Sequence, residues 1–264
     1  MPDPASDRTL SRKLCSDGGG ELLLSHYPPG GEQPRHVHDH AQISFLLAGR
    51  IEERIGQRTY EPVAGACVKA AGTDHSDRWG RDGAMMLSLR LPAVDEEGVP
   101  AVDRWGPADL ARVAQVVRAA LAGAAAAETG LLAADLLACI GRWEPPGGPP
   151  PAWLERVREA ASGLDRFSLA RAAGEAGVHR VHLSRAFARH YGLPLSLYRQ
   201  HVRNARALTG TLRRRNEPLA GIACATGFAD QSHMSRALRL ATGATPAGLR
   251  RLFSPGDARS GRRR

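Results

Sequence analysis

Several histidines in the first third of the chain have a spacing that could create a metal site or a polar pocket. His36 and His38 are separated by one residue, and His75 follows in the segment Ala-Gly-Thr-Asp-His. On a β-strand, alternate residues point to the same side, so residues 36, 38, 40 and 42 would face one way. Neutral imidazoles bind Zn²⁺, Fe²⁺ or Ni²⁺, whereas the Gln42 carboxamide is a weaker ligand than a carboxylate. The sequence therefore indicates either a divalent metal centre or a pocket without metal.

The pocket interpretation requires no cofactor. Imidazole, carboxamide and guanidinium groups that converge inside a barrel would bind a small polar or anionic effector. Local hydrogen bonding among these side chains is the third alternative. The residues expected to contact an effector are His36, His38, Gln42, His75 and Arg90, and those expected to bind a metal are His36, His38 and His75.

An internal repeat in the last hundred or so residues is the second informative feature. Each copy has the pattern of a short helix, a glycine-containing turn and a second helix, which is typical of a helix-turn-helix unit. Leu169-Ala170, Ala173 and Gly177 recur fifty positions later as Leu219-Ala220, Ala223 and Gly227, and His182-Leu-Ser-Arg-Ala-Phe187 recurs fifty-one positions later as His233-Met-Ser-Arg-Ala-Leu238.

The outer face of each second helix carries residue types that read DNA. Arginine can bind guanine through two hydrogen bonds, glutamine can pair with adenine, and a valine can touch a thymine methyl group. A solvated surface or a phosphate contact is the alternative for each arginine, but Arg185 and Arg236 occupy the same place in both copies, which favours base contacts. The candidate DNA-binding residues are Val181, Ser184, Arg185, Arg189, Gln231, Ser232, Arg236 and Arg239.

The segment between the two copies has apolar residues at helical spacing from Leu195 to about Arg215. Twenty or so helical residues span roughly 30 Å, which is close to the ~34 Å between successive major-groove faces of B-DNA. A single chain could thus place both second helices in adjacent grooves. Arginines along this connector are expected to contact the intervening phosphates: Arg199, Arg203, Arg206, Arg213, Arg214 and Arg215.

The elements that must position these residues follow from composition and periodicity. Short β-prone runs separated by glycine and proline predict an all-β barrel, and the helical spacing that follows predicts a helix pair that either packs on its own barrel or forms a homodimer seam. A Pro/Gly run predicts a linker. We expect a flexible arm at 1–20, the barrel at 21–92, the helix pair at 107–143, the linker at 144–152, the DNA-binding domain at 153–253 and an Arg-rich tail at 254–264.

Net charge divides along the same boundary. The 264 residues have a formal charge of +9, but residues 1–150 contain 15 basic and 20 acidic residues, whereas residues 151–264 contain 21 and 7. The two parts therefore carry −5 and +14. An acidic module joined to a strongly basic one is expected when only the basic module meets nucleic acid.

The remaining composition indicates a cytoplasmic protein. The four cysteines are far apart and form no CxxC pair, which excludes an evident disulfide framework or thiolate zinc site. No signal-peptide core and no apolar stretch of membrane-spanning length is present, so no membrane association is expected.

Residues 153–253 resemble the DNA-binding domain of AraC/XylS-type bacterial transcription regulators. The resemblance rests on LARAAGEAGVHRVHLSRAFARHYGLPLSLY and, more specifically, on IACATGFADQSHMSRALRLATGATPAGLR. Leu238 and Leu249 depart from the aromatic residues usual in the family, and both are packing positions. The resemblance implies that base contacts fall on Val181, Ser184 and Arg185 in the first unit and on Gln231, Ser232 and Arg236 in the second.

The spacing from Gly30 through the histidines to Gly49 resembles the first cupin motif, with Gln42 in place of the usual glutamate. The Pro, Gly and Asn of the second motif are missing around His75. Together the two resemblances imply an α+β multidomain protein with an N-terminal cupin-like β-barrel (jelly roll), a helical pair and a C-terminal all-α double helix-turn-helix domain.

The leading functional hypothesis is a non-enzymatic, sequence-specific transcription regulator controlled by a small-molecule effector in the barrel. Its expected partners are double-stranded promoter DNA, the effector, a second copy of the chain in a homodimer, and RNA polymerase. One alternative is a metal-dependent cupin enzyme with a DNA-targeting C-terminal domain, which needs a metal with an open coordination position. Another is an architectural nucleic-acid binder without sequence preference.

Overall fold

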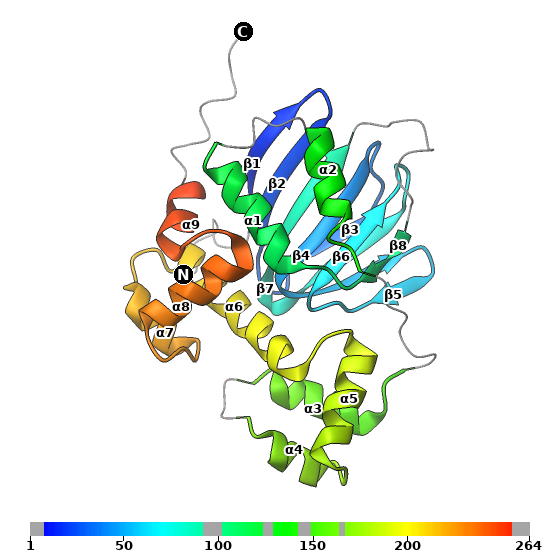
Figure 1. The fold of residues 1–264 in the computed structure, drawn as a ribbon, viewed down its shortest axis with the longest axis vertical. Coiled ribbons are helices and arrows are strands. Elements are labelled where there is room, and N and C mark those ends of the chain that lie inside the picture. The colour runs from blue at the N-terminus through cyan, green and yellow to red at the C-terminus, as the bar shows by residue number, and fades with distance from the viewer. Residues whose placement is uncertain (1–7, 92–101, 124–128, 142–148, 164–166, 255–264) are drawn as a thin grey trace.

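The computed structural model describes residues 8–91, 102–123, 129–141, 149–163 and 167–254 (Figure 1). An antiparallel β-domain precedes two helices, and a group of helices follows at the C-terminal end. The strands are β1 (Leu10–Asp17), β2 (Gly20–Tyr27), β3 (Glu32–His36), β4 (Ala41–Ile55), β5 (Arg58–Tyr60), β6 (Gly65–Lys69), β7 (His75–Leu91) and β8 (Val102–Gly106).

Two long strands, β4 and β7, pair with each other along almost their entire length and organise the sheet. Their register shifts between Leu46 and Ala48 and again between Gly49 and Ile51, which bends both strands. One side of the bend continues in the order β1-β2-β7-β4-β6-β8, while β3 pairs with β7 and β5 with β4 on the other side. Gly49 is required at the bend because its φ is +98° and a Cβ there would collide with the Gly83 carbonyl oxygen. The sheet therefore folds over on itself and encloses an interior.

Alternation along β4 separates an outer apolar face from the interior. Ile43, Phe45 and Leu47 belong to a core shared with helices, whereas Leu46 belongs to a separate core inside the folded sheet. The outer face is covered by α1 (Leu110–Leu121) and α2 (Thr129–Leu137), which lie across it (Figure 1). The inner core includes Ile51, Trp79, Met86 and Trp105.

The C-terminal helices form two helix-turn-helix units on one connecting helix (Figure 1). Ser168 caps the first unit by accepting from the Arg171 amide, as its position before the apolar stripe predicts. Gly177 and Gly227 adopt positive φ in the two turns. The helices are α3 (Ala152–Ala161), α4 (Leu169–Glu175), α5 (Arg180–Tyr191), α6 (Leu195–Arg213), α7 (Leu219–Ala225), α8 (Gln231–Thr242) and α9 (Pro246–Leu252), with α4–α5 and α7–α8 as the two units.

The two units are packed differently. The first lies in a separate core, in which Leu183, Phe187 and Tyr198 are fully buried and to which the barrel contributes Val63. The second shares the core of the barrel's outer face, because Leu208 of α6 and Met234 of α8 join the same apolar cluster as the strands. The second unit is thus part of the same hydrophobic core as the barrel.

Polar contacts reinforce the packing of α6 on the bend of β7. Arg206 Nε donates to Asp82 Oδ1 at 2.7 Å, and both side chains are mostly buried. Thr209 Oγ1 donates to the Asp82 carbonyl at 2.8 Å and lies 3.0 Å from His26 Nε2. A second ion pair, between Arg158 Nη1 of α3 and Glu61 at 2.7 Å, joins the two domains further along.

The structure differs from the sequence-based expectations about the organisation of the chain in three places. Leu10–Asp17, expected within a flexible arm at 1–20, pairs with β2 as the edge strand β1 because Leu10 and Leu14 pack against the outer core. The β-domain also extends past residue 92 to β8, which pairs with β6. Within the expected linker, Ala152 already begins α3; residues 142–148, and the expected tail from 255, lie outside the described residues.

The expected helix pair at 107–143 is present as α1 and α2 and packs on its own barrel, which was one of its two predicted roles. In the parts of the chain that the structure describes, no helix is both long and apolar enough to cross a bilayer.

Gly243 offers a test of the contact between α8 and α1. It ends α8 with φ +76°, and a Cβ there would collide with the Ala114 carbonyl oxygen of α1. Gly177 has φ +66° but open space around its Cβ position. We expect Gly177→Ala to cost ~1–2 kcal/mol from the left-handed backbone alone, and Gly243→Ala to cost more. If urea unfolding shows that both variants lose the same free energy of unfolding, α8 does not pack on α1 in solution.

Two buried histidines at the domain contact predict acid sensitivity. Burial lowers the pKa of His26 to about 3, aided by the nearby Arg213 charge, and burial lowers the pKa of His201 to about 4. Below pH 6.5 the unfolded chain binds protons that the folded chain does not. The free energy of unfolding should therefore fall between pH 6.5 and 4, by up to about 1.4 kcal/mol per pH unit for each histidine. His201→Gln should reduce this slope in denaturant titrations, and an unchanged slope would contradict the assignment.

Candidate functional site

The two recognition helices, α5 and α8, present the predicted DNA-binding residues on their solvent face. Leu183 and Phe187 of α5, and Met234 and Leu238 of α8, point into the cores. Ser184 differs from the other predicted residues because it is half-buried and donates to the Arg180 carbonyl at 3.0 Å. The exposed residues are Val181, Arg185, Arg189, Gln231, Ser232, Arg236 and Arg239.

Both recognition helices begin at a side-chain cap. The Asp230 carboxylate accepts from the His233 amide at 2.7 Å, and His179 Nδ1 accepts from the Val181 amide at 3.3 Å. Within the described part of the chain, no hydrogen bond or ion pair engages the guanidinium of Arg185 or Arg236. Their donors are consequently available for an external acceptor such as a base edge.

The arginines of the connecting helix are used differently from what the sequence suggested. Arg199 donates to the Ala161 carbonyl at the end of α3, and Arg215 donates to the Phe253 carbonyl at the end of α9. Arg206 binds Asp82, and Arg214 pairs with Glu217. Arg199, Arg206 and Arg215 are therefore engaged inside the chain in this arrangement, whereas the exposed Arg214 stays a predicted phosphate contact. The physical reason is that α6 is the buried centre of the domain, so its arginines reach carbonyls left free at the ends of neighbouring helices or nearby acidic groups.

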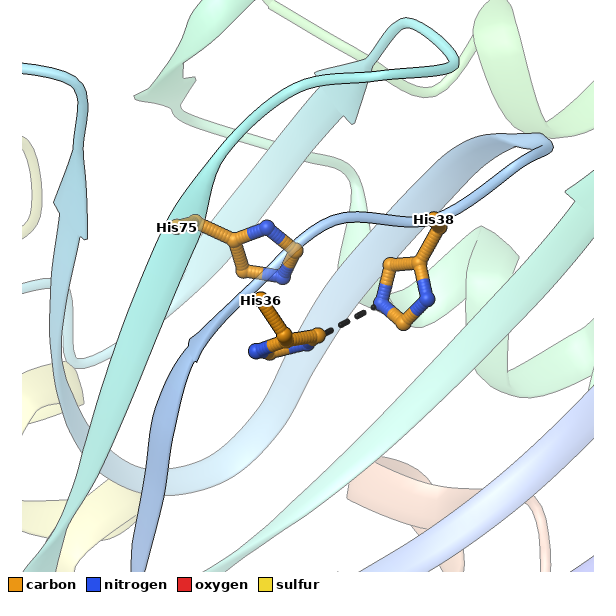
Figure 2. A group of neighbouring side chains, drawn as sticks. All are labelled: His36, His38 and His75. Atoms are coloured by element: carbon orange, nitrogen blue, oxygen red, sulfur yellow. Dashed lines mark hydrogen bonds between the residues drawn. The ribbon is translucent and has the colours of Figure 1, made fainter.

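Three histidines meet at the mouth of the folded sheet (Figure 2). His36 ends β3, His38 follows it, and His75 begins β7 directly opposite His36 in the antiparallel register. The Nε2 atoms of His36 and His38 are 3.2 Å apart, and the His75 ring centroid lies 4.2 Å from that of His36 and 5.2 Å from that of His38. The ligand nitrogens of all three lie within 4.8 Å of one another.

Backbone carbonyls orient two of these rings. His36 Nδ1 is 2.8 Å from the Pro34 oxygen, and His75 Nδ1 is 3.1 Å from the Thr73 oxygen. A ring that donates from Nδ1 to a carbonyl carries its lone pair on Nε2, the arrangement usual in histidines that bind metals. Burial, followed by the neighbouring histidines, lowers the pKa of His38 to about 4. Burial and the Lys69 charge also lower the pKa of His75. Both rings are therefore neutral near pH 7, the form that coordinates a cation.

A buried charged group lies next to the histidines. Glu53 accepts from Lys69 Nζ and from Trp105 Nε1, and all three side chains are buried. The pKa of Asp77 is raised to about 7, first by burial and then by the nearby Glu53 charge. Oxygens of Glu53 and Asp77 lie within 4.8 Å of a His75 nitrogen, so they form a second candidate ligand group that shares His75.

Sequence reasoning missed Glu53, Lys69 and Asp77, although one of them had a visible signal. Glu53 lies midway between Ile51 and Ile55, and residues two apart on a strand point to the same side. Its carboxylate is therefore expected on the apolar side of the strand, where a charge is rarely left unpaired. Lys69 and Asp77 gave no comparable signal, because their inward direction depends on the sheet register.

Gln42 and Arg90, predicted as effector contacts, lie side by side in the sheet. Gln42 is opposite both Lys69 and Arg90, and its amide donates to Ser44 Oγ at 2.6 Å. Within the described chain Arg90 Nε is buried and has no hydrogen-bond partner. Lys69 and Arg90 therefore flank Gln42 on the two neighbouring strands.

Comparisons with known proteins agree with this description of the C-terminal helices. The family model described as "Helix-turn-helix domain" matches residues 172–252. The C-terminal domain of AraT, a response regulator from Geobacillus stearothermophilus, is 23% identical over 44% of this chain and 97% of that chain, with a TM-score of 0.37. No curated protein matches the chain.

The N-terminal half is similar to other solved structures. KdgF from Halomonas is 17% identical over 33% of this chain and 82% of that chain, with a TM-score of 0.31. An RmlC-like cupin from Shewanella frigidimarina is 16% identical over 37% of this chain and 86% of that chain, also with a TM-score of 0.31.

The fold class predicted from the sequence is confirmed. An antiparallel β-domain precedes the helices, and a double helix-turn-helix domain ends the chain. Residues 172–252 are, more particularly, a helix-turn-helix domain.

Proposed function

We propose that this protein is a sequence-specific, non-enzymatic transcription regulator of the AraC/XylS type, controlled by a small molecule in its barrel. The observation that carries the proposal is the AraC-type domain itself, whose two recognition helices expose equivalent arginines, Arg185 and Arg236, that have no partner in the described chain. Each helix would enter a major groove and read bases through these residues and their exposed neighbours. Promoter DNA is the partner, and the regulator would act in the cytoplasm.

The barrel would serve as the sensor in this proposal. His36, His38 and His75 converge, the rings of His38 and His75 are neutral near pH 7, and Lys69 supplies positive charge nearby. The effector would be a small polar or anionic molecule held by His36, His38, His75, Gln42 and Arg90. The three histidines also fit a divalent cation, since the Nε2 atoms of His36 and His38 face each other, a His75 nitrogen lies within 4.8 Å of the nitrogens of both, and carbonyls fix two of the rings. A bound cation would supply a positive partner for an effector oxygen.

Effector binding would act by shifting a population of conformations. An effector changes DNA affinity only if it binds one arrangement of barrel and DNA-binding domain better than another. We propose that the regulator works as a homodimer, which presents two DNA-binding domains to paired half-sites, and that it contacts RNA polymerase at the promoter. A metal-dependent enzyme is the competing function, and it would turn over a substrate at the same histidines.

Base reading by the recognition helices can be tested with single substitutions. Arg185→Ala and Arg236→Ala should each relax preference at one base position and cost on the order of 1–3 kcal/mol on the selected site. Arg214→Ala, at the exposed end of α6, should instead lower the affinity for DNA of every sequence by the same factor. The target site would come from in vitro selection on random DNA, followed by binding assays over a range of salt concentrations. Equal loss on selected and random DNA would contradict base reading by Arg185 or Arg236.

Metal binding at the histidines can be tested separately. Titration calorimetry with Zn²⁺ or Ni²⁺ should show one site per chain in the unaltered protein, and His75→Ala or His38→Ala should weaken it by at least about tenfold. His40→Ala is the matched control because His40 lies next to His38 but outside the converging group. If His40→Ala weakens binding as much as the other two variants do, the assignment of ligands is wrong.

A further inference from the structure

A cleft of about 990 Å³ lies between the barrel and the DNA-binding domain, away from the histidines. Its walls come from the segment that leads into β6, the start of α1, the first half of α6 and the second half of α8. We propose that this cleft binds a small amphipathic organic anion, an apolar ring or chain with one acidic group. The proposal concerns a different site from the effector site of the barrel and stands without it.

Apolar side chains without a cover form part of the walls. Among the described residues only five large apolar side chains are exposed, and two of them, Leu197 and Leu240, line this cleft. Leu240 is 62% exposed and Leu197 is 42% exposed. The volume is that of a typical small-molecule site, and mostly apolar walls with a few polar groups are the usual composition of such a site.

The charged groups of the cleft favour an anion. The acidic lining residues are engaged: Glu61 and Glu155 pair with Arg158, and the Asp109 carboxylate caps α1 by accepting from the Arg112 amide. Arg58 and Arg104 are exposed on the cleft and have no ion pair or hydrogen bond within the described chain. Their unused guanidinium donors match the planar acceptors of a carboxylate or sulfonate.

Two unpartnered polar atoms lie in the wall formed by α6. His201 Nδ1 and Asn204 Oδ1 are buried, and no hydrogen-bond partner occurs for either in the described residues. Residues three apart lie on the same face of a helix, so both side chains are presented together. The two residues line the cleft, but these two atoms are themselves enclosed, so the wall there is polar without offering the ligand a direct contact at either atom.

The position of the cleft gives the ligand a structural effect. Leu197 and Leu240 belong to the DNA-binding domain, whereas Arg58 and Arg104 belong to the barrel. A molecule that contacts both walls binds only when the two domains are together, so it stabilises this arrangement by mass action.

Fluorescence titration of the DNA-free protein with two probes tests the proposal. The anionic probe is 8-anilinonaphthalene-1-sulfonate, and the neutral one is N-phenyl-1-naphthylamine, which lacks only the sulfonate. We expect saturable binding of the anionic probe with one site per chain. The double variant Arg58→Ala, Arg104→Ala should bind the anionic probe about tenfold more weakly and bind the neutral probe with unchanged affinity.

A substitution that fills the cleft provides the second arm. Ala241→Trp should abolish binding of both probes, whereas Leu121→Trp, at an exposed apolar residue outside the cleft, should not. Leu240→Glu should repel the anionic probe without disturbing the fold, because Leu240 is largely exposed. A cooperative thermal transition in each variant confirms folding. Undiminished anionic binding in both Leu240→Glu and the double arginine variant, or no binding by the unaltered protein, would overturn the proposal. The assay contains no DNA, so it is independent of DNA-binding function.

Discussion

The continuous antiparallel pairing of β4 with β7 is the constraint on which the rest of the structure depends. Because both strands bend together, alternate residues of one strand serve two environments. Ile43, Phe45 and Leu47 form the floor on which α1, α2 and α6 rest, while the other side of the strands holds a polar interior with Glu53 and His75. A change of register by one residue would move the charged set outward and expose the apolar set. The polar interior of the barrel and the face that contacts the C-terminal helices are therefore two sides of the same strands.

The arginines of the basic half divide into two groups with different roles. Those of α6, together with Arg215 just after it, bind carbonyls and carboxylates of this chain, and so hold α3, α9 and the β7 bend around the connecting helix. Those on the outer faces of α5 and α8 remain uncommitted. The formal charge of +14 in residues 151–264 thus overstates the charge that is available to DNA, because part of it neutralises local acidic groups and helix ends.

The sequence was sufficient where local pattern determines structure. The repeated helix-turn-helix units, the caps at Ser168 and the glycine turns follow from short-range spacing, and the meeting of His36 with His75 agrees with two histidine-bearing segments of one barrel. It was insufficient where the outcome depends on long-range pairing. The edge strand β1 is mostly exposed and weakly patterned, and the partners of Lys69, Asp77 and Arg206 are set by register and by domain docking. None of these can be read from neighbours in the chain.

The strand β7 connects the histidine group with the contact that the connecting helix makes on the barrel. It begins at His75 in the histidine group, and the contact with Arg206 and Thr209 of α6 is made at Asp82. Seven residue steps of extended chain separate these points, about 23 Å at ~3.3 Å per residue. The same strand thus carries the histidine group at one end and the contact with the connecting helix further along. Strain applied at the histidines would reach the DNA-binding domain through one hydrogen-bonded strand, without passing along the segment that covalently joins the two halves.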